Sequence, residues 1–141
     1  MNTFIMSASK TPVPNIIALA LTPTQDGIVD LPGATGANAF AVATSNLGAS
    51  DTITVMPQTG VAALPVSLSI CETEPSTGQC LAPPAPYVTT IIDADAPPTF
   101  AVFATGAGTV GFFPATHRID VVFLAGSQNI RGETSVAVRT Q

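Results

Sequence analysis

The sequence predicts an all-β protein with two stacked sheets. Short segments of alternating apolar and polar residues run along almost the whole chain, and Gly- and Pro-rich turns separate them. In residues 64–71, Leu, Val, Leu and Ile hold the even positions while Pro, Ser, Ser and Cys hold the odd ones. Successive side chains of a strand point to opposite faces, so such a segment buries one face only. With almost no helical period, this pattern indicates a sandwich or a barrel, and we expect a sandwich of roughly seven to nine strands.

The first half of the chain is expected to contain an arm followed by four strands. Residues 1–14 form an N-terminal arm or linker, because Pro12 and Pro14 favour an extended backbone, and one domain covers residues 15–141. Turn residues such as Pro32-Gly33 and Asn46-Leu47-Gly48 end the alternating segments. These segments are Asn15–Leu21, with Ile17, Leu19 and Leu21 on one side, Ile28–Leu31, Ala39–Thr44 and Asp51–Met56.

The second half is expected to contain five more strands. Residues 57–63 connect to the first of them, prolines at 83, 84 and 86 hold an exposed extended stretch, and Gly106 and Gly108 mark a turn. The last two strands are expected to form a hairpin across the Gly- and Asn-rich residues 125–132. The five segments are Leu64–Cys71, Tyr87–Ile92, Thr99–Thr105, Arg118–Leu124 and Glu133–Arg139.

Charge and hydropathy exclude two classes of partner. The net charge is −5, and the four cations, Lys10, Arg118, Arg131 and Arg139, are scattered, so nucleic acid and anionic membrane surfaces are poor partners. No window has the ~18 uninterrupted apolar residues of a membrane helix, so membrane insertion is not expected. The first ten residues do not form a signal peptide. The chain is therefore cytosolic or a fragment of a longer exported polypeptide, and we favour the fragment.

Two cysteines flank a predicted turn. Cys71 and Cys80 enclose Pro75-Ser76-Thr77-Gly78, and a hairpin-like excursion there would bring the sulfur atoms together. A bridge would imply an oxidising compartment, and the alternative is two unpaired small apolar residues. A zinc site is not expected, because two thiolates without nearby histidines do not complete a tetrahedron.

Two segments resemble bacterial immunoglobulin-like domains. Residues 39–48 resemble the B strand of these domains, where an alternating strand runs into an Asn-x-Gly turn, and residues 118–138 resemble the F–G hairpin. The stretch from Cys71 to Phe103 resembles repeats found in tandem in large exported bacterial proteins. The resemblance implies an immunoglobulin-like antiparallel β-sandwich that serves as a structural or adhesive module. The core Trp and long-range cysteine pair of antibody domains are missing, and no catalytic or binding residue carries over.

Few side chains suggest chemistry. His117 is the only histidine and no Gly-x-Ser-x-Gly motif is present, so we expect a loop histidine and no enzyme. Asp93 and Asp95 are spaced to reach one calcium ion, with Asp26 and Asp30 as a looser pair, although solvated turn carboxylates are the simpler interpretation. The glycines of residues 106–111 lack the following helix that a phosphate-binding loop needs.

Aromatic residues divide into two expected groups. Phe112, Phe113 and Tyr87 are candidates for a sugar-binding face. Core packing explains the remaining candidates more simply: Phe40, Phe100, Phe103 and Phe123.

The expected function is a non-catalytic structural or adhesive module, extracellular or on the bacterial cell surface, or else periplasmic. Its partners would be neighbouring domains or subunits of the same protein, and no cofactor is expected. One alternative is a module that binds cell-surface glycan, or calcium through Asp93 and Asp95, with contacts near Phe112. Another is a self-assembling fibre or surface-layer subunit in which residues 15–21 pair with a neighbour's sheet edge.

Overall fold

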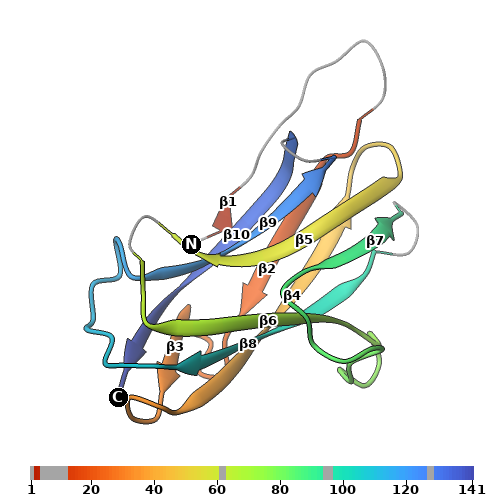
Figure 1. The fold of residues 1–141 in the computed structure, drawn as a ribbon. Helices are drawn as coiled ribbons and strands as arrows, with labels where there is room; N and C mark the ends of the chain where they lie inside the picture. The colour runs from red at the N-terminus through yellow and green to blue at the C-terminus, as the bar shows by residue number, and fades with distance from the viewer. Residues whose placement is uncertain (1, 4–12, 61–62, 94–96, 127–128) are drawn as a thin grey trace.

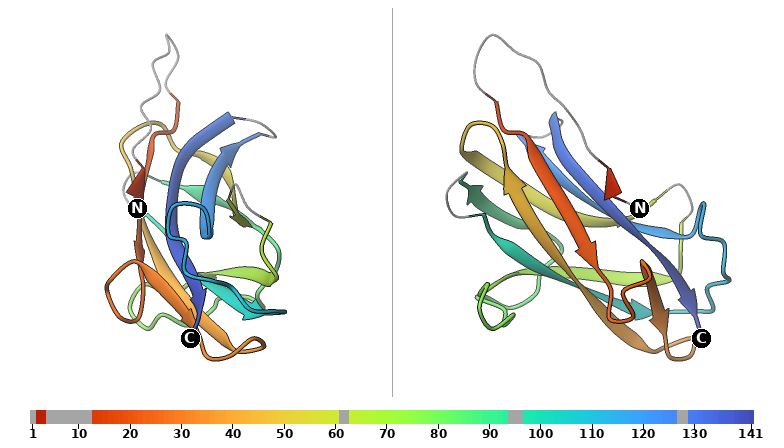
Figure 2. Two further views of the ribbon diagram at one scale, coloured as in Figure 1. Left: turned by 90° about the vertical axis from the view of Figure 1, so that its left-hand side faces the viewer. Right: turned by 180° about the vertical axis from the view of Figure 1, so that it is seen from behind.

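The computed structural model describes residues 2–3, 13–60, 63–93, 97–126 and 129–141. Ten strands and no helix occur in these residues, so the predicted all-β architecture is confirmed (Figure 1). The strands form two sheets that stack as two layers, with β9 and β10 in one layer and β2 and β4 in the other (Figure 2, left). This is one strand more than the expected maximum of nine, and the additional strand is the two-residue β1.

The larger sheet has six strands in the order β1-β10-β9-β5-β7, with β3 also paired to β10. All its pairs are antiparallel except β3 with β10, which run parallel. β9 and β10 form the predicted terminal hairpin. The strands are β1 (Asn2–Thr3), β3 (Ile28–Leu31), β5 (Asp51–Thr59), β7 (Val88–Ile92), β9 (Arg118–Ala125) and β10 (Asn129–Thr140).

The smaller sheet has four strands in the order β2-β4-β8-β6, and every pair is antiparallel. Its strands are β2 (Ile16–Leu21), β4 (Ala37–Asn46), β6 (Val66–Thr73) and β8 (Thr99–Gly106). All nine segments expected from the sequence are therefore strands; β3 has the expected bounds, and the other eight are shifted at one or both ends. β5, for example, continues through Pro57 to Thr59. Its pairing with β7 ends at Val55, so the N–H group that Pro57 lacks is not needed for a hydrogen bond to that strand.

The core lies between the sheets and is apolar and continuous. Phe100 and Phe123, from opposite sheets, meet edge to face with ring centroids 6.0 Å apart. Phe40 is also buried, as core packing predicts. The same expectation is wrong for Phe103: β8 turns Phe100 and Val102 inward, so Phe103 points to the outer face of the smaller sheet and is only half-buried. Around them pack fully buried aliphatic residues from both sheets: Val29, Leu31, Val42, Ile53, Val55, Ile70, Ile92, Val102, Ile119, Val121 and Val138.

In β2, the face that carries the two leucines points to solvent and not to the core. Ile16 and Ala18 are buried, whereas Leu19 and Leu21 are 46% and 49% exposed. β10 crosses close to the start of β2: a Cβ at Gly132 would lie 2.5 Å from the Ile16 carbonyl oxygen. Pairing with β4 then fixes the register that points Ile16 and Ala18 inward.

The sandwich has two opposite ends, which we name by a central residue of each. At the Asn46 end, Leu47 and Ala49 donate backbone hydrogen bonds to Asn15 and Val13. At the Arg139 end, Gln141 exchanges backbone hydrogen bonds with Leu31 and Gly33. β4 runs from one end to the other, a length of about 33 Å for ten residues, and Figure 1 shows the start of β2 and the C-terminus at these opposite ends.

Within the predicted arm, the structure describes residues 2, 3, 13 and 14. Asn2 and Thr3 form β1, which pairs with Thr134 and Glu133 of β10. Pro14 is buried at the Asn46 end. Residues 4–12 lie outside the described part of the chain.

Candidate functional site

A buried amide organises the Asn46 end. The Asn46 side chain is 3% exposed, and its oxygen accepts hydrogen bonds from the backbone N–H groups of Asn15 (3.1 Å) and Gly48 (2.9 Å). Its nitrogen donates to the carbonyl oxygens of Ala49 and Ile92, each at 2.9 Å. All four hydrogen-bonding positions of the amide are used. Asn46 therefore ties together the chain entering β2, the β4–β5 turn and the end of β7.

One of the two predicted calcium ligands, Asp93, lies at this same end. Asp93 follows β7, and its carboxylate accepts a 3.3 Å hydrogen bond from the Ser50 hydroxyl. Asp95 lies outside the described residues. Among the described residues, no three His, Cys, Asp or Glu side chains gather closely enough to hold a metal ion.

The looser acidic pair is separated by its hydrogen bonds. Asp26 accepts hydrogen bonds from the Thr24 hydroxyl (2.6 Å) and the Ile28 N–H (3.0 Å). Both hydrogen bonds lower the pKa of Asp26, and the bond from Thr24 has the larger effect. Asp30 instead forms an ion pair with Arg139. The two carboxylates therefore have different partners.

The predicted bridge between Cys71 and Cys80 is confirmed, with the two Cα atoms 5.5 Å apart. Cys71 lies on β6, and the chain after the turn comes back along the outer edge of that strand. Ala85 exchanges two backbone hydrogen bonds with Ile70, and the Leu81 N–H donates to the Glu72 carbonyl oxygen. The disulfide thus fastens a covering segment over an edge strand of the smaller sheet.

Charged and aromatic side chains gather at the Arg139 end. Arg139 Nε lies 2.5 Å from Asp30 Oδ1, and the guanidinium group lies 4.9 Å from the centroid of the Phe112 ring. The neighbouring Phe113 packs edge to face against the His117 ring at 5.0 Å. Both phenylalanines are at least half exposed. Two residue types favoured at protein interaction sites, Phe and Arg, are therefore presented together.

His117 is held by the loop that contains it. Its Nδ1 lies 2.9 Å from the Gly111 carbonyl oxygen, and because a carbonyl only accepts, Nδ1 carries the proton. Its backbone N–H donates to Phe113 and its carbonyl accepts from Val138. These contacts match the expected loop histidine, and they fix the ring beside Phe113.

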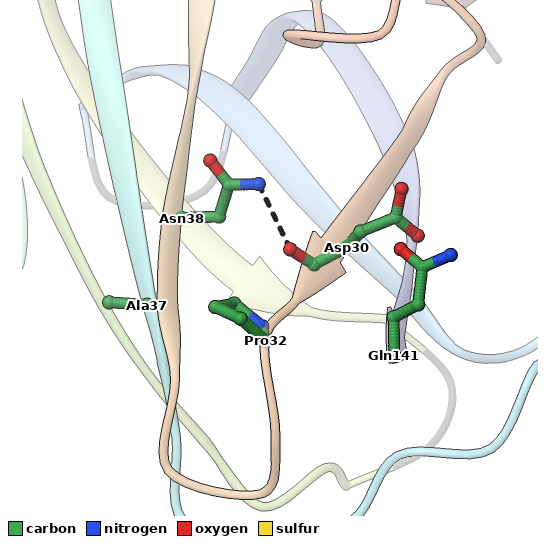
Figure 3. A pocket seen from close by; sticks show the side chains of 5 residues that line it. All are labelled: Asp30, Pro32, Ala37, Asn38 and Gln141. Atoms are coloured by element: carbon green, nitrogen blue, oxygen red, sulfur yellow. Dashed lines mark hydrogen bonds between the residues drawn. The ribbon is translucent and has the colours of Figure 1, made fainter.

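A shallow hollow of about 550 Å³ lies next to this cluster (Figure 3). It is lined by Asp30, Pro32, Ala37, Asn38 and Gln141. The Asn38 amide nitrogen donates a 2.9 Å hydrogen bond to the Asp30 carbonyl oxygen, as the dashed line in Figure 3 shows. The hollow therefore lies between β3 and the start of β4, which this hydrogen bond connects, and it opens beside the Asp30–Arg139 pair.

The structure does not bring the proposed sugar-binding aromatics together. Tyr87 precedes β7, which is the end strand of the larger sheet. Phe112 packs on Arg139 of β10, which β5 and β9 separate from β7. Asp93 is likewise at the Asn46 end, while Phe112 is at the Arg139 end. A single small ligand that contacts Phe112 would therefore not also reach Tyr87 or Asp93.

Two carboxylates on the outer face of the larger sheet are electrostatically unfavourable. Burial raises the pKa of Asp120, against the opposing effect of Arg118. Burial also raises the pKa of Glu133, and the charge of nearby Asp120 raises it further. A carboxyl group whose pKa is higher in the folded than in the unfolded protein reduces stability once it ionises.

We therefore expect Glu133→Gln to raise the melting temperature at pH 7. The gain should shrink as the pH falls toward 4.5, the ordinary pKa of glutamate, because wild-type Glu133 then becomes neutral as well. Thermal denaturation followed by circular dichroism from pH 4 to pH 8 measures the effect. Glu74→Gln removes the same charge from a turn and serves as the control. An equal gain in the two variants would show that net charge, and not the position of Glu133, is responsible.

Sequence reasoning missed the central roles of Asn46 and Arg139. Asn46 was visible as part of a turn, but its bond to Ile92 joins residues 46 positions apart. The partner of Arg139 is 109 positions away. An asparagine that ends a strong alternating strand, on the parity of the buried residues, was the available signal for the first.

The chain matches no protein-family model and no curated protein. In the part of the chain that the structure describes, no helix has the length and apolar character to cross a membrane.

Proposed function

We propose that this protein is an immunoglobulin-like structural or adhesive module of an exported bacterial protein. The observation that carries the proposal is the order of its strands. β2-β4-β8-β6 follows the A-B-E-D order of an immunoglobulin constant-type sheet, and β10-β9-β5 follows the G-F-C order of the opposite sheet. On this assignment, the B strand is β4 and the F–G hairpin is β9–β10, the two segments whose sequences resemble that family.

One feature departs from the variable-type pattern. β7 occupies the position beside the C strand that C′ takes in variable domains. Here, however, the chain forms β6 in the other sheet before it forms β7. The proposal is therefore a variant of the immunoglobulin-like arrangement with its two middle strands exchanged in chain order.

The disulfide supports the exported part of the proposal. Disulfides persist in oxidising compartments such as the periplasm and the cell exterior.

Surface labelling tests the location. Antibodies raised against the folded protein should bind intact cells of the source organism, and beads coated with the protein should adhere to cells or to matrix. Labelling that requires permeabilised cells would contradict an exposed surface module. A periplasmic location would show as labelling after the outer membrane alone is opened.

Glycan binding at the Arg139 end is a second candidate. The observation that favours it is the exposed Phe112–Phe113 pair beside the Asp30–Arg139 ion pair, because sugars stack on aromatic rings and hydrogen-bond to charged planar groups. A glycan array with the wild type and with Phe112→Ala/Phe113→Ala tests it. Binding that persists in the double variant would exclude this end as the site.

Limited trypsin digestion tests the domain boundary. We expect one early cut at Lys10, in the predicted arm, and a persistent fragment that begins at Thr11. Arg118, Arg131 and Arg139 lie on the hydrogen-bonded strands β9 and β10, where backbone pairing protects the chain. Mass spectrometry of the time course identifies the fragments. Early cleavage after Arg118 or Arg131 would be incompatible with a stable hairpin.

A further inference from the structure

We propose that two copies of this chain form a two-fold dimer in which the outer faces of their four-stranded sheets stack on each other. The outer face comprises the side chains that point away from the core on β2, β4, β6 and β8. β2 and β4 lie side by side in the right-hand view of Figure 2. This dimer uses the face of the sheet, whereas strand addition would use its edge, and the proposal is independent of the proposed function.

The first observation is that the outer face carries no charge on any of its strands. The register places small and uncharged side chains in rows across the sheet, such as Thr73–Thr99–Ala43–Leu19 and Cys71–Ala101–Ala41–Leu21. Of the outward-pointing residues, Cys71 and Thr73 are already buried within the chain. The full set is Ile17, Leu19, Leu21, Ala37, Ala39, Ala41, Ala43, Ser45, Ser67, Ser69, Cys71, Thr73, Thr99, Ala101, Phe103 and Thr105.

The charges of the two layers differ. The opposite face, on the larger sheet, carries Arg118, Asp120, Glu133 and Arg139. With a net charge of −5 per chain, two copies repel each other unless they meet on a neutral surface. The strands of the smaller sheet meet this requirement, since none of them carries a charged side chain on the outer face. Glu74, which directly follows β6, is a carboxylate residue beside this face.

The second observation is a ridge beside a trough. Leu19 and Leu21 project from β2 and are about half exposed. Beside them lies an apolar trough of about 190 Å³ whose floor includes Ala41, Ala43 and Ala101. Leu21 forms one wall, and Glu74 and Pro75, at the start of the disulfide-bonded excursion, help to form the other. A trough of this volume is large enough to accept a leucine side chain.

Ridge and trough on one face identify the partner as a second copy. In a two-fold interface, residue i of one copy contacts residue j of the other and the reverse contact follows by symmetry. Placing the leucine ridge of each copy in the alanine trough of the other therefore fills both troughs at once. Small alanine side chains on the floor let the two sheets approach closely enough for this contact.

The area agrees with a weak but specific dimer. Cys71 and Thr73 in the second half of β6 are already buried, so the open face comprises β2, β4, β8 and the first half of β6. With strands ~4.8 Å apart and ~3.3 Å per residue, this face measures roughly 450 Å². Two such faces bury roughly 900 Å², which lies just below the ~1,000 Å² of a stable specific interface and in the range of weak, transient ones. We therefore expect a dimer that dissociates on dilution.

Sedimentation velocity and light scattering of the full chain from 5 µM to 1 mM test the proposal. The wild type should rise with concentration from the 14.2 kDa monomer toward twice that mass. Ala41→Arg places a charge on the trough floor at an exposed position and should weaken dimerisation at least 100-fold. Leu21→Lys should do the same from the ridge, and circular dichroism should show both variants folded.

Ile91→Lys is the matched control, because Ile91 is a large apolar residue, 64% exposed, on the edge strand of the other sheet. It should dimerise like the wild type. A wild type that remains monomeric at 1 mM overturns the proposal. A dimer that tolerates Ala41→Arg and Leu21→Lys also overturns it, and would indicate pairing through a strand edge or through the larger sheet.

Discussion

Replacing Asn46 with alanine is expected to lower the free energy of unfolding by about 3 kcal/mol, because the truncation leaves several buried backbone groups without partners. The N–H groups of Asn15 and Gly48 lose their acceptor, and the carbonyl groups of Ala49 and Ile92 lose a donor. An orphaned buried group costs ~1–3 kcal/mol, and solvent is expected to reach part of the site after truncation. For a domain of this size the change corresponds to a fall of roughly 10 °C in melting temperature.

Asn38→Ala is the matched control for this prediction. Asn38 lies on the same strand, but it is half-buried and its amide makes a single bond to another element, the 2.9 Å bond to the Asp30 carbonyl. We expect this variant to lose about 1 kcal/mol. Urea denaturation of both variants and the wild type measures the difference. Equal losses would mean that Asn46 acts as an ordinary turn residue and not as the tie between three segments.

The strands were predictable because burial imposes a period of two on the sequence. In β8, Phe100, Val102 and Ala104 are buried while the residues between them are not. The terminal hairpin was equally predictable from the sequence. The buried residues Ile119, Val121 and Phe123 on β9 share a face with Val136 and Val138 on β10. In these segments one parity is clearly more apolar than the other, so the sequence alone determines which face turns inward.

β2 shows where this reasoning fails. Its sequence, Ile-Ile-Ala-Leu-Ala-Leu, is apolar in both parities, so alternation does not select a face. Tertiary contacts decide instead: β10 approaches Ile16 at Gly132, and pairing with β4 aligns Ala18 with the inward-facing Thr44. The leucines are left outside, and they form the ridge of the proposed dimer. A strand that is ambiguous in the sequence thus leaves two half-exposed leucines on the surface.

The sites depend on partners that are distant in sequence, and this limited their prediction. The Asp30–Arg139 pair exists because β3 runs parallel to β10, and a parallel pairing between residues more than 100 positions apart leaves no local pattern. The disulfide was predictable because its two cysteines are nine residues apart around a recognisable turn. Interactions between residues close in sequence, such as the disulfide, could be predicted from the sequence. Interactions between distant residues, such as the Asp30–Arg139 ion pair, required the strand topology.

Removing the disulfide is expected to cost about 2.5 kcal/mol. The bridge closes a loop with a sequence separation of nine residues, and the entropy of that loop in the unfolded chain sets the scale. The double variant Cys71→Ala/Cys80→Ala avoids free thiols and should lose this amount in urea denaturation. Because the bridge also holds the segment that covers the edge of β6, we expect faster amide hydrogen exchange at Ile70 and Ala85 than in the wild type.

Reduced wild-type protein separates the two contributions of Cys71. The Cys71 side chain is 1% exposed, so the alanine variant loses packed volume as well as the cross-link, whereas reduction keeps the sulfur in place and loses only the cross-link. We therefore expect the reduced protein to be less stable than the oxidised protein and slightly more stable than the double variant. If reduction left both the unfolding midpoint and the exchange at Ile70 unchanged, the backbone hydrogen bonds between β6 and the returning segment would suffice to hold it, and the bridge would contribute nothing to the fold.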